Sequence, residues 1–158
     1  MEPADPESDG DPGNHSGHAG AFFEPAGLFM ILGGTGTADS QKAWGFNGSS
    51  WRDLGPEDDE ANPNPGIRKN HCATYDTDRN RAVVYGGDNQ GSIVGDTWEW
   101  RGSLWTEATI LDTEGDGNPD TVEKSAMAYA PLFLDGETYL FGGVTAADDY
   151  PSETWRFN

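Results

Sequence analysis

A pair of glycines follows a short apolar run three times along this 158-residue chain. The pairs end at Gly34, Gly87 and Gly143, so successive copies lie 53 and 56 residues apart. A fixed period of this size indicates a chain of supersecondary repeats, each of which needs a neighbour to bury its apolar face. Glycine tolerates positive φ and close backbone approach, so we expect a structural role for all six: Gly33, Gly34, Gly86, Gly87, Gly142 and Gly143.

A tryptophan follows each glycine pair after about ten residues, and in the first two copies a second one comes seven residues later. The segments WGFNGSSW and WEWRGSLW predict two strands joined by a two-residue turn, with Asn47-Gly48 or Arg101-Gly102 at the tip. We expect these indoles to pack between repeats, because each has a large area to bury: Trp44, Trp51, Trp98, Trp105 and Trp155. Trp100 has an alternative role as an exposed sugar-binding platform, on the expectation that it faces away from Trp98.

The first strand of each copy is marked by a shared position fifteen residues before the glycine pair, occupied by His18 and His71. An aromatic residue stands four positions after each histidine, at Phe22 and Tyr75. A shared repeat position favours packing or hydrogen bonding over metal ligation. Each copy therefore encodes four short antiparallel strands, and the chain is predicted to be all-β.

The middle copy, RKNHCATYDTDRNRAVVYGG followed by DTWEWRGSLW, resembles the bacterial form of the kelch repeat, one blade of a β-propeller. The resemblance covers residues 15–158 and implies three four-stranded blades. The predicted segments are an acidic disordered tail (1–14), blade 1 (15–54), a linker (55–63), blade 2 (64–107), an insertion loop (108–120) and blade 3 (121–158), whose last strand is missing.

Propellers close with roughly four to eight blades, so three make a partial ring. We expect the chain to be part of a longer protein, or to associate with a second copy that completes the propeller.

One stretch carries the spacing of a cation site. ILDTEGDGNPDTVEKS places acids at positions 1, 3, 5 and 12 of a loop with glycine at position 6, the pattern of an EF-hand-like calcium loop. The string DTEGDGNPD also resembles thrombospondin type 3 calcium repeats. Calcium takes six to eight oxygen ligands, and the candidates here are Asp112, Glu114, Asp116, Asn118, Asp120 and Glu123. The alternative is a solvated acidic insertion without bound metal.

The net charge of −19 disfavours nucleic acid and anionic membrane surfaces as partners. No apolar run reaches the ~20 residues of a membrane helix, and no signal peptide is visible. The weak calcium site expected here would suit an extracellular or cell-surface protein. The single cysteine, Cys72, excludes an intrachain disulfide.

No motif for a nucleophile with its base, a phosphate loop or a metalloprotease site is present. The sequence therefore predicts a non-enzymatic binding module that recognises a protein or a carbohydrate through its loops. The alternative is a fragment of an oxidase-like or epimerase-like kelch enzyme whose catalytic residues lie in further blades.

Overall fold

The computed structural model describes residues 10–36, 42–55, 63–102, 104–109, 117–131 and 136–157. Within these ranges the regular structure is β-sheet apart from one turn of 3-10 helix, Glu24–Ala26 (η1). The strands form three separate antiparallel sheets, none of which closes on itself. The predicted all-β class is confirmed. In the same described ranges, no helix is long and apolar enough to span a membrane.

Sheet 1 contains four strands in sequence order: β1 (Ala19–Phe23), β2 (Leu28–Leu32), β3 (Ala43–Phe46) and β4 (Trp51–Asp53). Alternation along β1 and β2 places Ala21 and Met30 opposite each other on one face and Phe22 and Phe29 on the other. This period of two gives the sheet two apolar faces, as a sheet lying between two others would need.

Sheet 2 comprises β5 (Arg68–Lys69), β6 (Cys72–Asp76), β7 (Arg81–Asn89), β8 (Ser92–Trp100) and β9 (Trp105–Ala108). β5 and β6 pair with the same edge of β7, one after the other, and the ladder between β7 and β8 shifts register between Tyr85 and Gly87. β5 corresponds to isolated bridges at the same place in the other sheets, Ser16 with Thr35 and Glu123 with Val144.

Sheet 3 contains β10 (Ala126–Ala130), β11 (Glu137–Phe141) and β12 (Thr154–Phe157). The prediction of four strands in every repeat therefore matches sheet 1. Sheet 2 carries one additional short strand, and sheet 3 has three strands in the part of the chain that the structure describes.

Both tryptophan hairpins are closed by a backbone bond, from Asn47 N to Ser50 O and from Arg101 N to Leu104 O, so two residues form the turn as predicted, but one position later than the expected Asn47-Gly48 and Arg101-Gly102. Phe46 pairs with Trp51, and Trp100 pairs with Trp105. The Asn47 side-chain oxygen accepts hydrogen bonds from the amides of Ser49 and Ser50, each at 2.9 Å. This register places two aromatic rings opposite each other, and the ring centroids of Phe46 and Trp51 lie 5.0 Å apart.

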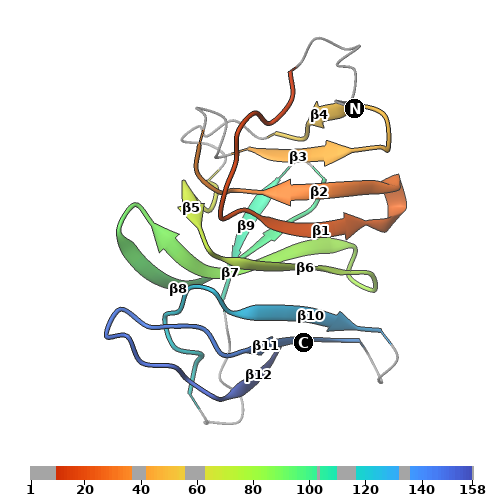
Figure 1. The fold of residues 1–158 in the computed structure, drawn as a ribbon. Helices are drawn as coiled ribbons and strands as arrows, with labels where there is room; N and C mark the ends of the chain where they lie inside the picture. Colours follow the sequence, from red (N-terminus) through yellow and green to blue (C-terminus); the bar gives the residue numbers. More distant parts are fainter. Residues whose placement is uncertain are drawn as a thin grey trace.

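β1, β6 and β10 lie side by side, with β6 in the middle (Figure 1). We call these three the first strands of their sheets, since the two-residue β5 matches only an isolated bridge in the other sheets. From this column sheet 1 extends upward, sheet 2 recedes behind and sheet 3 extends downward in the view of Figure 1. Small residues at the column, such as Ala21 and Ala73, let the strands approach closely.

One hydrophobic core fills the space between sheets 1 and 2. Met30 and Leu32 from sheet 1 meet Val84, Trp98 and Trp100 from sheet 2. Trp100 is fully buried on the same face as Trp98, because residues two apart in a strand point to the same side. The expectation of an exposed sugar platform at Trp100 is therefore wrong.

A second core lies between sheets 2 and 3, where Cys72 and Tyr85 pack with Val122 and Leu140. Trp155 and Phe157 are partly buried against this cluster. Among the other repeat tryptophans, Trp44 and Trp105 are buried and Trp51 is partly buried.

Candidate functional site

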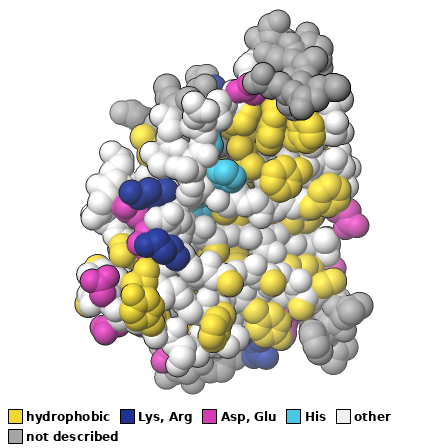
Figure 2. All heavy atoms as spheres, viewed as in Figure 1, with side chains coloured by type: hydrophobic (Ala, Val, Ile, Leu, Met, Phe, Trp, Pro, Cys, Tyr) yellow, Lys and Arg dark blue, Asp and Glu magenta, His cyan; other side chains and the backbone are white. Residues whose placement is uncertain are grey.

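A groove of about 220 Å³ opens at the end of the sheets where the glycine pairs and inter-sheet segments lie. It is formed by the segment after β2, the segment around β5 and the β7–β8 hairpin. The lining residues are Gly34, Thr35, Ile67, Arg68, Lys69, Asp88, Gln90 and Gly91. Figure 2 shows basic side chains beside acidic ones over this left-hand end of the molecule.

A pair of opposite charges lies in the groove. Lys69 Nζ lies 3.1 Å from an Asp88 carboxylate oxygen, and the Lys69 side chain is well exposed. The other Asp88 oxygen accepts the Gly91 amide at 2.5 Å. These contacts, the Gly91 hydrogen bond foremost, lower the pKa of Asp88 and keep it ionised at neutral pH. The pair and the Gln90 amide offer charged and neutral hydrogen-bonding groups to a ligand.

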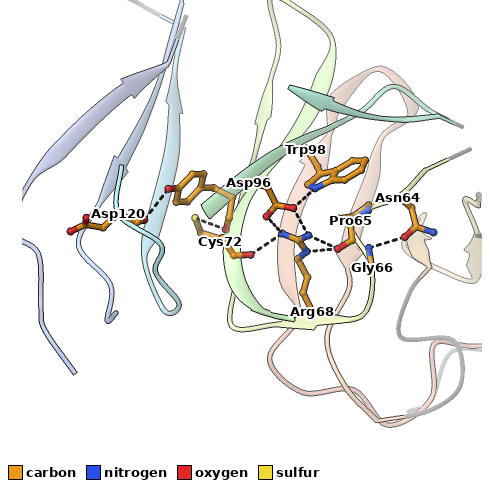
Figure 3. A network of polar contacts seen from close by, with 10 residues as sticks. Asn64, Pro65, Gly66, Arg68, Cys72, Asp96, Trp98 and Asp120 are labelled. Carbon is orange, nitrogen blue, oxygen red and sulfur yellow. Dashed lines mark hydrogen bonds and ion pairs between the residues drawn. The ribbon is translucent and has the colours of Figure 1, made fainter. Parts of the chain in front are cut away.

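Arg68 forms the floor of this site and is almost completely buried. Its two terminal nitrogens donate to the two oxygens of Asp96 at 2.7 and 2.8 Å, a bidentate pair. The guanidinium also donates to the carbonyl oxygens of Pro65 and Gly86, at 2.7 Å from Nε and 3.0 Å from Nη1. Figure 3 shows the guanidinium held between Asp96 on one side and Pro65 on the other.

Asp96 is the counter-ion of Arg68 and is held in a fixed orientation. Its second oxygen accepts the Trp98 indole N–H at 2.6 Å. Burial by itself would raise the pKa of Asp96, but the hydrogen bonds from Arg68 and Trp98 outweigh it, and the pKa is lowered. The network ties the segment before β5 to β8 and gives the groove a rigid base.

A second polar network lies on the side of sheet 3. The Tyr85 hydroxyl donates towards the carbonyl oxygens of Pro119 and Asp120, at 3.0 and 2.9 Å. Cys72 is buried, and this burial raises the pKa of its thiol to about 11. The thiol is therefore protonated at neutral pH and is unsuited to nucleophilic chemistry.

The residues of the predicted calcium loop are only partly described. Asp112, Glu114 and Asp116 lie outside the described residues. Asn118 and Asp120 are exposed. The Glu123 carboxylate accepts hydrogen bonds from Asn70 and Lys124, each at 2.7 Å, so both of its oxygens contact other side chains. The described residues contain no group of three or more His, Cys, Asp or Glu placed to hold a metal ion.

The sequence did not single out the groove residues. Lys69, Asp88 and Gln90 come together only because β5 pairs with β7 and the glycine pair bends β7. A comparison of the repeats could have indicated these residues. Lys69 and Asp88 occupy the positions of Ser16 and Thr35 in sheet 1, so the same backbone place carries different chemistry in each repeat.

No family model matches the chain. Over 82 residues, 51% of its length, it is 38% identical to the dynein alpha chain of the flagellar outer arm of Chlamydomonas reinhardtii. Over 151 residues, 89% of its length, it is 28% identical to multiple epidermal growth factor-like domains protein 8 of Mus musculus. The aligned segments make up 2% and 5% of those proteins, so the chain spans a small part of each.

Proposed function

We propose that this chain is a segment of a kelch-type β-propeller that acts as an interaction module, with the groove around Lys69 and Asp88 as its recognition site. Three antiparallel sheets in sequence order, with their first strands side by side, support the propeller interpretation. The alignment with small segments of two much longer proteins fits a module within larger assemblies.

The observation that carries the proposal is the ion pair between the exposed Lys69 and Asp88, next to the buried Arg68 and its counter-ion Asp96. The hydrogen bonds that hold Arg68, Asp96 and Asp88 in place favour binding, because these groups lose little freedom on association. The alternative of an enzyme fragment depends on residues in further repeats and gains no support from the groove.

A protein ligand suits the groove better than a carbohydrate. None of the groove-lining residues is aromatic, whereas aromatic faces commonly stack against sugar rings. Lys69, Asp88 and Gln90 can instead pair with the carboxylates, amides and hydroxyls of a polar peptide segment.

The test is selection of peptides from a displayed random library against the wild-type chain and the variant Lys69→Ala/Asp88→Ala/Gln90→Ala. We expect peptides that bind the wild type at least about tenfold more tightly than this variant. Leu104→Glu, in the hairpin at the far end of sheet 2, is the control and leaves binding unchanged. Equal binding to wild type and triple variant would refute the groove as the site. A glycan array run in parallel detects the carbohydrate alternative.

Binding of Ca²⁺ by residues 112–123 is a separate proposal, supported by the spacing of acids in the sequence.

A further inference from the structure

The contact between successive sheets repeats the same backbone bonds. The amide of the second glycine in each pair donates to a carbonyl on the next sheet: Gly34 to Arg68 at 2.7 Å, and Gly87 to Val122 at 2.8 Å. A second bond links residues just before the first strands: Asn70 N to Gly17 O at 2.7 Å, and Lys124 N to Asn70 O at 2.6 Å. The spacing within each repeat is the same at both junctions.

No neighbouring sheet covers the outward face of sheet 1 among the described residues, and part of this face is exposed. Phe22 is 57% exposed, whereas Tyr75, at the same place in sheet 2, is 6% exposed against sheet 1. Phe29 is 45% exposed, whereas its counterpart Ala82 is 0% exposed. The exposed part is confined to the surroundings of Phe22 and Phe29, since Ile31 on β2 and its partner Trp44 on β3, on the same face, are 5% and 1% exposed. Figure 2 shows hydrophobic side chains gathered over β1–β3.

Sheet 3 presents the complementary half of the same contact. Phe141 is 53% exposed, whereas Leu32 and Tyr85, at its position in sheets 1 and 2, are 1% and 0% exposed beneath the following sheet. A Cβ at Gly33 would lie 2.8 Å from His71 of the next sheet, but a Cβ at Gly142 would meet only the Pro151 carbonyl, at 3.7 Å. Space is therefore open where a following sheet would lie.

The polar groups at the two ends also match. In sheet 2 the His71 imidazole bonds the Leu32 carbonyl oxygen of sheet 1 at 2.8 Å. His18 occupies the same position in sheet 1 and is exposed, and Phe141 supplies the carbonyl equivalent to that of Leu32. The repeat spacing pairs the Gly143 amide with the His15 carbonyl. For Gly143 the described residues provide no backbone acceptor.

We propose that the outward face of sheet 1 is a docking surface for the outward face of sheet 3 of a second copy of this chain. The surface lies apart from the ligand groove, so the inference does not depend on ligand recognition. Because the two faces differ, the contact is heterologous, and two copies that use both faces form a closed pair. The two junctions within the chain show which surface fits this face. Sheet 2 packs on sheet 1, and sheet 3 packs on sheet 2 in the same way.

The net charge of −19 per copy opposes this association. Added salt screens repulsion between separated charges and leaves apolar contacts intact, so the affinity rises with ionic strength. A contact made chiefly through charge pairs would weaken instead.

Sedimentation velocity of the full chain over the micromolar range tests the proposal, with a concentration-dependent dimer expected. Phe22→Glu and Phe141→Glu each place a charge in the contact and are expected to weaken self-association at least about tenfold. Both side chains are exposed, so the monomer fold is retained, which circular dichroism checks. Leu104→Glu, at a similarly exposed apolar residue in the 101–104 turn, is the matched control and dimerises like the wild type.

Mixing the two variants is the decisive measurement. The Phe22→Glu copy retains an intact sheet 3 face, and the Phe141→Glu copy retains an intact sheet 1 face. The mixture therefore forms a 1:1 complex through one junction, although neither variant associates alone. A wild type that stays monomeric at high salt, a Phe141→Glu variant that dimerises normally, or a mixture without complex each overturns the proposal.

Discussion

His71 Nε2 lies 2.8 Å from the carbonyl oxygen of Leu32, so a side chain at the start of sheet 2 bonds the end of a strand in sheet 1. The ring is buried, and burial together with the nearby Arg68 charge lowers the pKa of His71 to about 4. The neutral imidazole is therefore part of the junction between the two sheets at physiological pH.

Acid should weaken this junction. Between about pH 4 and 6.5 the unfolded chain binds more protons at His71 than the folded chain, so the free energy of unfolding falls as the pH decreases. The slope from this one group reaches at most about 1.4 kcal/mol per pH unit. Urea unfolding of the wild type and of His71→Gln across this range separates the contribution of His71 to the pH dependence from that of the carboxylates, which are the same in both proteins. Identical pH dependence in the two proteins would contradict a buried neutral imidazole.

The Arg68–Asp96 pair provides a second prediction. Asp96→Asn leaves the buried guanidinium without its counter-charge, and we expect a loss of about 3–5 kcal/mol in the free energy of unfolding. The double variant Arg68→Met/Asp96→Asn should lose less than the sum of the single changes, because the two side chains interact directly. Arg156→Ala breaks an exposed ion pair with Glu137 and should cost less than about 1 kcal/mol. Equal losses for the buried and exposed pairs would refute the role assigned to Arg68.

Three glycines at the same repeat position provide a graded prediction. Gly33, Gly86 and Gly142 all have φ between 57° and 66°, so alanine strains the backbone similarly at each. An added Cβ would lie 2.4 Å from the Val122 carbonyl oxygen at Gly86 and 2.8 Å from His71 at Gly33, but 3.7 Å from its nearest neighbour at Gly142. We expect the loss in the free energy of unfolding on substitution by alanine to be largest at Gly86, smaller at Gly33 and smallest at Gly142. The losses should differ by about 1–3 kcal/mol because of steric overlap. Chemical denaturation measures the stability of the three variants. A Gly142→Ala protein as unstable as Gly86→Ala would contradict the packing at these glycines.

Calcium is expected to raise the unfolding temperature more than equal magnesium at high salt, as binding to the folded state does by mass action. Asp112→Ala/Asp116→Ala should abolish the difference, whereas Asp148→Ala/Asp149→Ala removes the same charge elsewhere and should not. Lys124→Met frees one oxygen of Glu123 and should strengthen the calcium effect. Equal responses of both double variants would indicate a solvated acidic loop.

The repeat pattern predicted the sheets because period-two alternation and turn glycines act locally, within each hairpin. It placed the first hairpin tip one residue too early: Asn47 precedes the turn, and its side-chain oxygen accepts hydrogen bonds from the amides of Ser49 and Ser50. It also missed Lys69 and Asp88, whose proximity depends on pairing between β5 and β7 and not on spacing along the chain. The burial of Trp100 follows from strand alternation, and the opposite expectation misapplied that rule.

The bonds from Asn70 to Gly17 and from Lys124 to Asn70 are made by main-chain atoms, and all three residues have φ near 60°. Side-chain identity matters little for such a bond, provided that the residue tolerates a left-handed conformation, as glycine and asparagine do. A repeat can thus be duplicated or exchanged while its surface chemistry diverges freely. The backbone contacts between successive first strands are then the same for every repeat. A repeat with a different binding specificity can therefore be added without a change in the residues that join it to its neighbour.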